Sequence, residues 1–195
     1  MALAAACVVW AVLAASCRAP EAPKPGTATP VYNRETGRLE QLVSDRDGDG
    51  SIDTRAYMDG TRVVRIEIDR DDDGAPDRFE YYGPTTATGD PVIERAEERQ
   101  GTPPQVVRRE FYQSGLVVRV EEDTDADGRV DKWEYYEGRL LSVDLDLVGT
   151  GKPNRRLHYG ADGTVHRVES DTDGDGIFER VPAPSGPPPG QGRTK

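Results

Sequence analysis

The feature that most constrains this chain is an acidic nine-residue motif that recurs along it. Aspartate occupies positions 1, 3 and 5, glycine follows at position 6, and an acidic residue closes the motif at position 9. Copies begin at residues 45, 69, 123 and 171. The first two starts are 24 residues apart and the last two are 48 apart, which leaves room for one more unit. Such a fixed period indicates an array of small units rather than one large core.

Two further copies are degenerate. Residues 146–154 keep Asp146 and Asn154 at the motif ends but lose the aspartates between them. A second unit is marked only by its downstream aromatic stretch at 109–112, which matches the stretches at 79–82 and 133–136. The turn-rich segment 83–91 accounts for the extra residues around that unit. The sequence therefore contains six loop positions, four acidic and two degenerate.

The segments between the loops alternate apolar and polar residues, as in 64–68, 118–121 and 141–145. Alternation with period two and many β-branched or aromatic residues predicts half-buried strands. Short turns such as Asp59-Gly60 favour hairpins. The predicted fold class is therefore all-β. It is an antiparallel β-meander or hairpin repeat array of about six units of ~24 residues, with about twelve strands and calcium-binding loops between strands.

The charge of the chain limits its partners. The formal net charge is −11, and about half of the 36 acidic residues lie in the four motifs, so nucleic acid is not expected as a partner. The basic residues are mostly arginines interspersed with glutamate, among them Arg65, Arg95 and Arg119, which predicts cross-strand ion pairs. The hydrophobic fraction is 35%, and much of it lies in the first 17 residues, so a large core is not expected in the remainder.

An apolar run from Ala2 to Ala15 is too short to span a bilayer and suits a signal peptide. It ends in Leu13-Ala14-Ala15-Ser16-Cys17, which resembles the lipobox of bacterial lipoproteins. The resemblance implies lipidation at Cys17 and a membrane-anchored, exported protein of the cell envelope, by default in the outer membrane. An ordinary signal peptide or a short membrane anchor are the alternatives. The predicted divisions are a lipoprotein signal peptide (1–16), a Pro/Ala-rich tether (17–31), a repeat domain (32–181) and a disordered tail (182–195).

The acidic motifs carry the pattern of a calcium loop. Calcium takes six to eight oxygen ligands, and alternate acidic side chains at positions 1, 3 and 5 can point at one centre, with glycine at 6 for the sharp turn. Positions 9 and 12 complete the shell, the latter with a bidentate glutamate. Ca²⁺ is the one expected cofactor. The predicted ligands are Asp45, Asp47, Asp49 and Asp53; Asp69, Asp71, Asp73, Asp77 and Glu80; Asp123, Asp125, Asp127, Asp131 and Glu134; and Asp171, Asp173, Asp175 and Glu179.

These loops resemble EF-hand-type calcium loops, although each is followed by an aromatic stretch and a glycine turn instead of a helix. Dockerins also need that helix, and thrombospondin type 3 repeats carry cysteines that this repeat lacks. The strand-flanked calcium loops of integrin propeller blades are closer. Tyr135-Tyr136-Glu137-Gly138-Arg139-Leu140 resembles the hairpins of YD and MORN-variant repeats. The resemblance covers residues 32–181 and implies calcium binding and a β-repeat fold, with no specific activity.

Three other interpretations compete with the calcium module. In the first, the acidic motifs are plain solvated turns, in which Asp and Gly are also common. A specific carbohydrate- or protein-binding module would use an aromatic sheet face, and contiguous exposure of Tyr81, Tyr112, Trp133 and Tyr135 would favour it. An enzyme is not expected, because no nucleophile elbow or phosphate loop is present and His158 and His166 have no partners marked by spacing.

Overall fold

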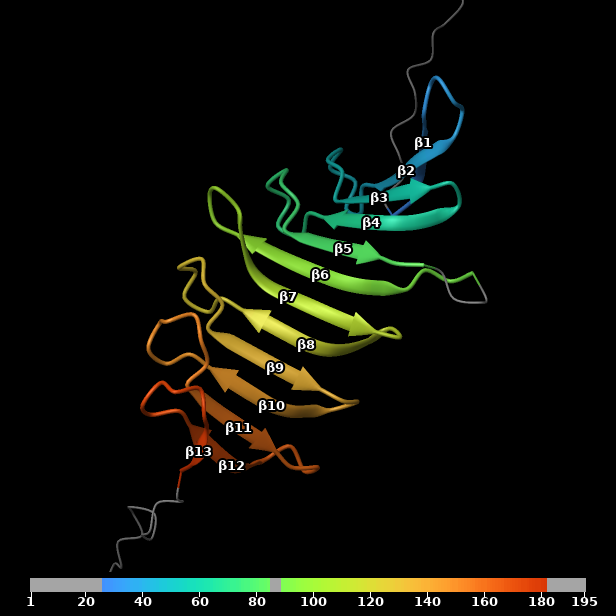
Figure 1. Ribbon diagram of the computed structural model, residues 1–195. Coiled ribbons are helices and arrows are strands. Elements are labelled where there is room, and N and C mark those ends of the chain that lie inside the picture. The colour runs from blue at the N-terminus through green and yellow to red at the C-terminus, as the bar shows by residue number, and fades with distance from the viewer. Residues whose placement is uncertain (1–25, 85–88, 182–195) are drawn as a thin grey trace, which may run out of the picture.

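The computed structural model describes residues 26–84 and 89–181 and confirms the all-β meander. All strands lie in one open antiparallel sheet, in which each strand pairs with its neighbours in the sequence (Figure 1). In the described ranges, no helix is long and apolar enough to cross a membrane. The strands are β1 (Thr29–Tyr32), β2 (Leu39–Ser44), β3 (Thr54–Asp59), β4 (Arg62–Ile68), β5 (Arg78–Tyr82), β6 (Ile93–Gln100), β7 (Gln105–Gln113), β8 (Leu116–Glu122), β9 (Lys132–Tyr136), β10 (Leu140–Leu145), β11 (Arg155–Tyr159), β12 (Val165–Ser170) and β13 (Glu179–Arg180).

The sheet has 13 strands where the sequence predicts about twelve. The added strand is at the N-terminal end, because β1 begins at Thr29, inside the segment predicted as tether. The predicted signal peptide at 1–16, Cys17 and the tail at 182–195 lie outside the described residues.

Because the strands form a meander, successive connections alternate between the two edges of the sheet (Figure 1). The acidic loops follow β2, β4, β8 and β12, and the degenerate loops follow β6 and β10, so all six lie at the same edge. We call this side the loop edge. The connections at the other edge include tight turns in which Gly60, Gly115 and Gly138 adopt positive φ values of 67°, 77° and 66°. Glycine adopts this conformation without the steric penalty of a Cβ atom.

The sheet is a single layer with little interior. Among the described residues, the buried apolar side chains are Ala96, Val120 and Val143. A conventional core is therefore absent from the described part of the chain, and the long polar and aromatic side chains that lie across the strands cover the two faces. Cross-strand pairs of this kind are the main unit of stabilisation in such a sheet.

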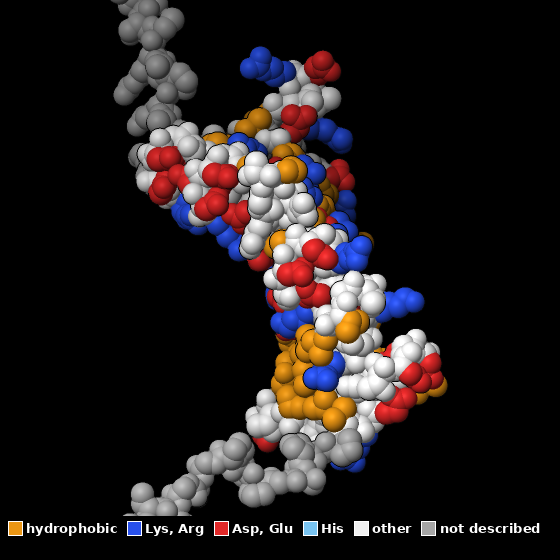
Figure 2. Space-filling view, turned by 90° about the vertical axis from the view of Figure 1, so that its left-hand side faces the viewer, with side chains coloured by type: hydrophobic (Ala, Val, Ile, Leu, Met, Phe, Trp, Pro, Cys, Tyr) orange, Lys and Arg blue, Asp and Glu red, His pale blue; other side chains and the backbone are white. Residues whose placement is uncertain are grey.

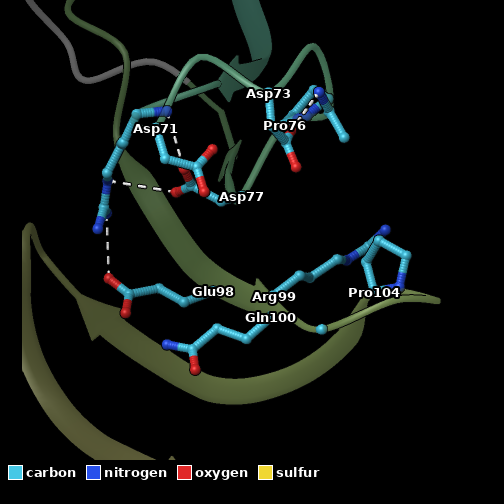
Figure 3. Close-up of a pocket in the computed structure, with 11 residues that line it drawn as sticks. Asp71, Asp73, Pro76, Asp77, Glu98, Arg99, Gln100 and Pro104 are labelled. Carbon is cyan, nitrogen blue, oxygen red and sulfur yellow. Dashed lines mark hydrogen bonds and ion pairs between the residues drawn. The ribbon is translucent and has the colours of Figure 1, made fainter.

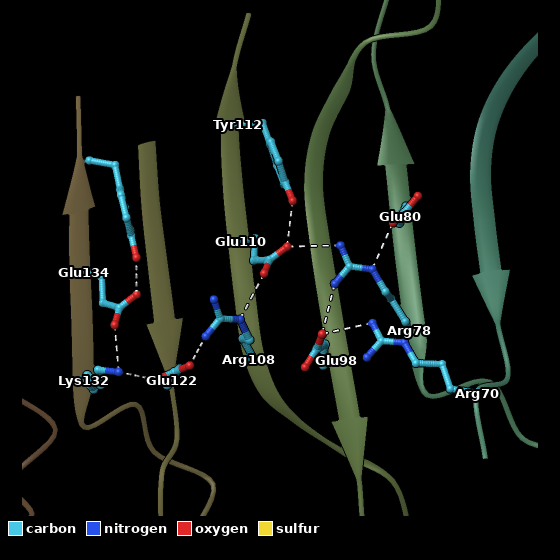
Figure 4. Close-up of polar contacts among 11 residues, drawn as sticks. Arg70, Arg78, Glu80, Glu98, Arg108, Glu110, Tyr112, Glu122, Lys132 and Glu134 are labelled. Atoms are coloured by element: carbon cyan, nitrogen blue, oxygen red, sulfur yellow. Dashed lines mark hydrogen bonds and ion pairs between the residues drawn. The ribbon is translucent and has the colours of Figure 1, made fainter. Parts of the chain in front are cut away.

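One face carries a chain of ion pairs, and we call it the ion-pair face (Figure 4). Arg78 contacts Glu98 at 3.0 Å and Glu110 at 3.1 Å, so its guanidinium links β5, β6 and β7. Tyr82, Tyr112 and Tyr136 each donate a hydrogen bond to the glutamate two residues earlier. Half-buried networks stabilise a fold more than isolated surface pairs do. The full chain of contacts runs through Arg70, Glu98, Arg78, Glu110, Arg108, Glu122, Lys132 and Glu134.

This network predicts a measurable loss of stability in acid. Burial raises the pKa of Glu110, but hydrogen bonds from Tyr112, Arg108 and Arg78 bring it below its ordinary value of 4.5. The unfolded chain then binds the proton more tightly, so the stabilisation is present above pH 4.5 and is lost as the pH falls through the folded-state pKa. We expect Glu110→Gln to flatten the fall in urea midpoint between about pH 5 and pH 3. Glu35→Gln, in an exposed turn, is the control, and a wild-type slope in Glu110→Gln would contradict this assignment.

Toward the C-terminal end, the ion-pair face becomes apolar. Val143, Leu157 and Val168 stand in register on β10, β11 and β12. Figure 2, which looks onto the loop edge, shows a hydrophobic patch near this end and acidic side chains recurring along the edge.

The opposite face, which we call the stacked face, alternates aromatic rings with arginines across successive strands. One row in register is Tyr57, Arg65, Tyr81, Arg95, Phe111, Arg119 and Tyr135. Arginine side chains cover several of these rings, as Arg95 does at 4.3 Å from the centroid of Tyr81. On this face, Arg65, Arg95 and Arg119 pair with glutamates of their own strands, as Arg65 does with Glu67. The predicted cross-strand ion pairs form on the ion-pair face.

The aromatic residues expected to share one exposed face are divided between the two. Trp133 and Tyr135 lie on the stacked face with Tyr81, but Tyr112 donates to Glu110 on the ion-pair face. All four are half-buried. The sheet therefore has no contiguous platform of these four rings.

Candidate metal-binding edge

The first aspartate of each acidic loop organises the loop backbone. The carboxylate of Asp69 accepts hydrogen bonds from the backbone N–H of Asp72 at 2.8 Å and of Gly74 at 2.9 Å. Asp45, Asp123 and Asp171 bind their own loops in the same way, always including the glycine at position 6. Asp45, Asp69 and Asp123 are only 2%, 3% and 6% exposed, so the carboxylate at position 1 of these three loops is a buried acceptor, whereas Asp171 is half-buried.

Positions 5 and 9 add further backbone contacts. In the first three acidic loops, the residue at position 9 accepts the N–H of position 2, as Asp77 does from Arg70 at 2.8 Å. The aspartate at position 5 accepts the N–H of position 7, as Asp127 does from Arg129 at 2.8 Å. This last contact is an Asx turn, which asparagine can also form.

The degenerate loop between β10 and β11 folds in the same way without the full acidic set. Asp146 accepts hydrogen bonds from Gly149 at 2.9 Å and Gly151 at 2.5 Å, and Asn154 accepts from Leu147 at 2.9 Å. Burial raises the pKa of Asp146, but these backbone donors lower it below its usual value. The loop conformation therefore needs only positions 1 and 9 and the glycines. Sequence reasoning missed this structural role, although Asp146 and Asn154 align with positions 1 and 9 of the intact motifs.

Successive loops are also joined through their backbones. The N–H of Asp69 donates to the carbonyl of Asp53 at 2.8 Å, and Asp146 donates to Asp131 at 2.8 Å. Asp171 donates to Asn154 at 3.0 Å. In these three loops, position 1 is thus fixed by position 9 of the loop before it, whereas the N–H of Asp123 donates to the carbonyl of Val107 at 2.9 Å.

The structure brings most predicted ligands into clusters whose oxygen atoms lie within 4.8 Å of one another. Ligands at about 2.3–2.6 Å from a calcium ion can be up to about 5 Å apart, so this spacing fits a shared cation. Within single loops, the clusters are Asp45, Asp47 and Asp53; Asp69, Asp71 and Asp77; Asp123, Asp125 and Asp127; and Asp171, Asp173 and Asp175. The predicted ligands Asp73, Asp131 and Glu179 lie in or beside the loops but are not in these clusters.

One cluster spans two loops and includes a residue that the motif does not mark. Asp47 and Asp49 of the first acidic loop approach Asp72 of the second. Partial desolvation, and then the charges of Asp49 and Asp47, raise the pKa of Asp72. Asp72 occupies position 4 of its loop, where it has a positive φ of 64°, and it clusters with Asp47 and Asp49 rather than with the carboxylates of its own loop.

Glu80 and Glu134, predicted to close the shell at position 12, are engaged elsewhere. Glu80 lies in β5 and accepts hydrogen bonds from Arg78 at 2.9 Å and Tyr82 at 2.7 Å. Glu134 lies in β9, 2.7 Å from Lys132, and accepts from Tyr136 at 2.6 Å. Burial and then the bond to Glu134 raise the pKa of Tyr136 to about 12. Both glutamates therefore belong to the ion-pair face rather than to a loop.

An open hollow of about 450 Å³ lies beside the second acidic loop (Figure 3). Asp71, Asp73 and Asp77 line one side, and the other side is lined by Pro104 and by residues at the end of β6. Arg70 links the two sides through ion pairs with Asp77 at 3.5 Å and with Glu98 at 3.0 Å. A cation bound to this loop would remain accessible to water from the hollow.

Neither a family model nor a curated protein matches the sequence. Among solved structures, accessory secretory protein 1, 2 and 3 in Streptococcus pneumoniae matches 67% of this chain and 21% of that chain, with a TM-score of 0.32 and 10% identity. The GtfA/B complex matches 63% of this chain and 22% of that chain, with a TM-score of 0.32 and 11% identity. The chain spans about a fifth of the length of either, and likeness at this level bears on neither ligand nor activity.

Proposed function

We propose that this protein is a calcium-binding structural or interaction module of the cell envelope, stabilised by Ca²⁺ along its loop edge. One observation carries the proposal. The loop at 146–154 adopts the same backbone with Val148 and Thr150 at positions 3 and 5, where the acidic loops have aspartates. Those extra carboxylates are not needed to fold the loop, and all of them except Asp73 lie close enough to other carboxylates to share a hard cation.

Electrostatics support a metal rather than a plain turn. Asp71 and Asp125 are exposed carboxylates held within 4.8 Å of buried carboxylates at position 1. Like charges at this distance repel, and a divalent ion would reverse the sign of that interaction. Calcium sites of exported modules bind at about 10⁻⁴–10⁻³ M, which suits a permanent structural ion.

Isothermal titration with CaCl₂ tests the proposal. We expect binding at the four acidic loops, and about a tenfold or greater loss of affinity at the second loop in Asp71→Asn/Asp73→Asn. Asparagine keeps the Asx turn and removes the charges. Glu80→Gln is the matched control, since Glu80 has the ligand chemistry but lies on the ion-pair face, and its calcium affinity should stay near wild type.

Two outcomes would reject parts of this assignment. Absence of calcium-dependent heat in the wild type would make the acidic loops solvated turns. A loss of affinity in Glu80→Gln equal to that of the loop variant would restore position 12 as a ligand.

Export and lipid anchoring at Cys17 complete the proposal and rest on the lipobox resemblance. The membrane is then the one partner we assign, and a protein or glycan partner is left open.

A further inference from the structure

The stacked face carries arginines at a regular interval. Arg65 on β4, Arg95 on β6 and Arg119 on β8 stand in one row, separated by Tyr81 and Phe111. Neighbouring strands are about 4.8 Å apart, so these guanidinium groups recur roughly every 9.6 Å along the row. We call these three residues the arginine row.

Aromatic rings hold the arginine row in place. The guanidinium carbons of Arg65, Arg95 and Arg119 lie 4.1, 4.3 and 4.2 Å from the ring centroids of Tyr57, Tyr81 and Phe111. Stacked arginines have lost much of their conformational freedom before any ligand arrives, which lowers the entropic cost of binding. Their side chains are nevertheless 39%, 42% and 42% exposed.

Between β3 and β9, the two central rows of this face carry a net positive charge, opposite to that of the whole molecule. The row itself contains no acidic residue between Tyr57 and Tyr135. The neighbouring row toward the loop edge adds Arg55 and Arg109 against Glu67, Glu97 and Glu121. The two rows together hold five arginines and three glutamates, in a chain of net charge −11.

The existing ion pairs on this face leave the arginines available. Glu67 and Glu121 each contact one terminal nitrogen, Nη2, of Arg65 and Arg119, at 2.9 and 3.1 Å. Arg95 lies 3.6 Å from Glu97. The arginine of each pair is about 40% exposed although its glutamate is largely buried, so a ligand with several anionic groups can contact the solvent side of the guanidinium groups.

We propose that the arginine row binds a linear anionic polysaccharide, in which carboxylates repeat about once per disaccharide. A disaccharide is roughly as long as two strand spacings, about 9.6 Å, so successive carboxylates can meet successive arginines. A flexible polymer can follow the twist of the row, which a rigid acidic surface cannot. Guanidinium groups cover the rings of Tyr57, Tyr81 and Phe111, so recognition is by charge rather than by stacking of neutral sugars.

Binding of fluorescent hyaluronate oligosaccharides, which carry one carboxylate per disaccharide, tests this site, with neutral dextran for comparison. The full chain is used in saturating CaCl₂, so that calcium occupancy of the acidic loops is the same in every measurement. We expect Arg65→Gln/Arg95→Gln/Arg119→Gln to weaken binding about tenfold or more. The control Arg34→Gln/Arg38→Gln/Arg46→Gln removes the same charge from exposed positions outside the row and should stay within about twofold of wild type.

The proposal does not rest on calcium binding, and its outcomes are separate. Equal weakening in both triple variants, equal binding of dextran, or no binding by wild type would overturn it. If circular dichroism shows that the glutamine variant does not fold, two other measurements test the proposal. Arg65→Lys/Arg95→Lys/Arg119→Lys should retain binding, and wild-type affinity should fall as NaCl is raised. Affinity independent of salt would overturn the proposal. Self-association in the absence of hyaluronate, lost in the glutamine variant, would instead assign the row to a second copy of the chain.

Discussion

Calcium is expected to raise the melting temperature of this protein by about 10 °C or more. A site with a dissociation constant of about 10⁻⁴–10⁻³ M adds roughly 1.4–2.7 kcal/mol at ~10 mM Ca²⁺. Four acidic loops would together add roughly 6–11 kcal/mol, and each kcal/mol shifts the melting temperature of a domain of this size by about 2–4 °C. Thermal melts followed by circular dichroism, in EDTA and in CaCl₂, measure this difference.

The matched variant carries asparagine at Asp71, Asp73, Asp125 and Asp127. It keeps the Asx turns of both loops but removes their exposed charges, so it should lose at least half of the calcium-induced rise. In EDTA, it should melt at or above the wild-type temperature, because repulsion is relieved. Equal wild-type melts in EDTA and CaCl₂ would mean that the acidic loops are solvated turns.

Removing the carboxylate at position 1 is expected to destabilise the protein even without calcium. Asp123→Ala loses the acceptor for the N–H groups of Asp127 and Gly128, at 3.1 and 2.8 Å. Two such bonds to a charged acceptor, in a side chain only 6% exposed, contribute roughly 2–4 kcal/mol. Chemical unfolding in EDTA should show a lower midpoint in urea with little change in slope.

The degenerate loop provides the comparison for this second prediction. Asp146→Ala removes equivalent bonds to Gly149 and Gly151 and should be similarly destabilising, but the calcium response should remain. Asp125→Ala removes an exposed ligand and should do the opposite, with little effect in EDTA and a reduced calcium response. If Asp146→Ala left stability unchanged, the carboxylate at position 1 would have no structural role.

The repeat alone was enough to predict an antiparallel meander with acidic loops between its strands. Its period of 24 residues allows two short strands, a tight turn and a nine-residue loop. The alternation in 64–68 and 118–121 correctly placed strands there. The strand at Thr29–Tyr32 was missed because that segment lies outside the repeat and has the composition of a linker.

The ligand at position 12 was assigned by analogy with a helix-flanked loop. Glu80 is the third residue of β5, and an extended chain advances about 3.3 Å per residue, so its carboxylate moves away from the loop. The alternation of β5 then places it beside Arg78 and Tyr82. The stacking of arginine on aromatic rings also escaped prediction, because it depends on cross-strand register, which the β-bulges near the turns alter locally.

In this single-layer architecture, the number of repeats determines the length of the sheet. Because every strand pairs only with its sequence neighbours, β1 and β13 lie at opposite ends of the sheet. Each repeat adds two strands, or roughly 9.6 Å, without changing the environment of distant repeats. Insertion or deletion of one whole repeat should therefore alter the end-to-end reach by a fixed step. A gene with more or fewer repeats would encode the same surface at a different distance from β1.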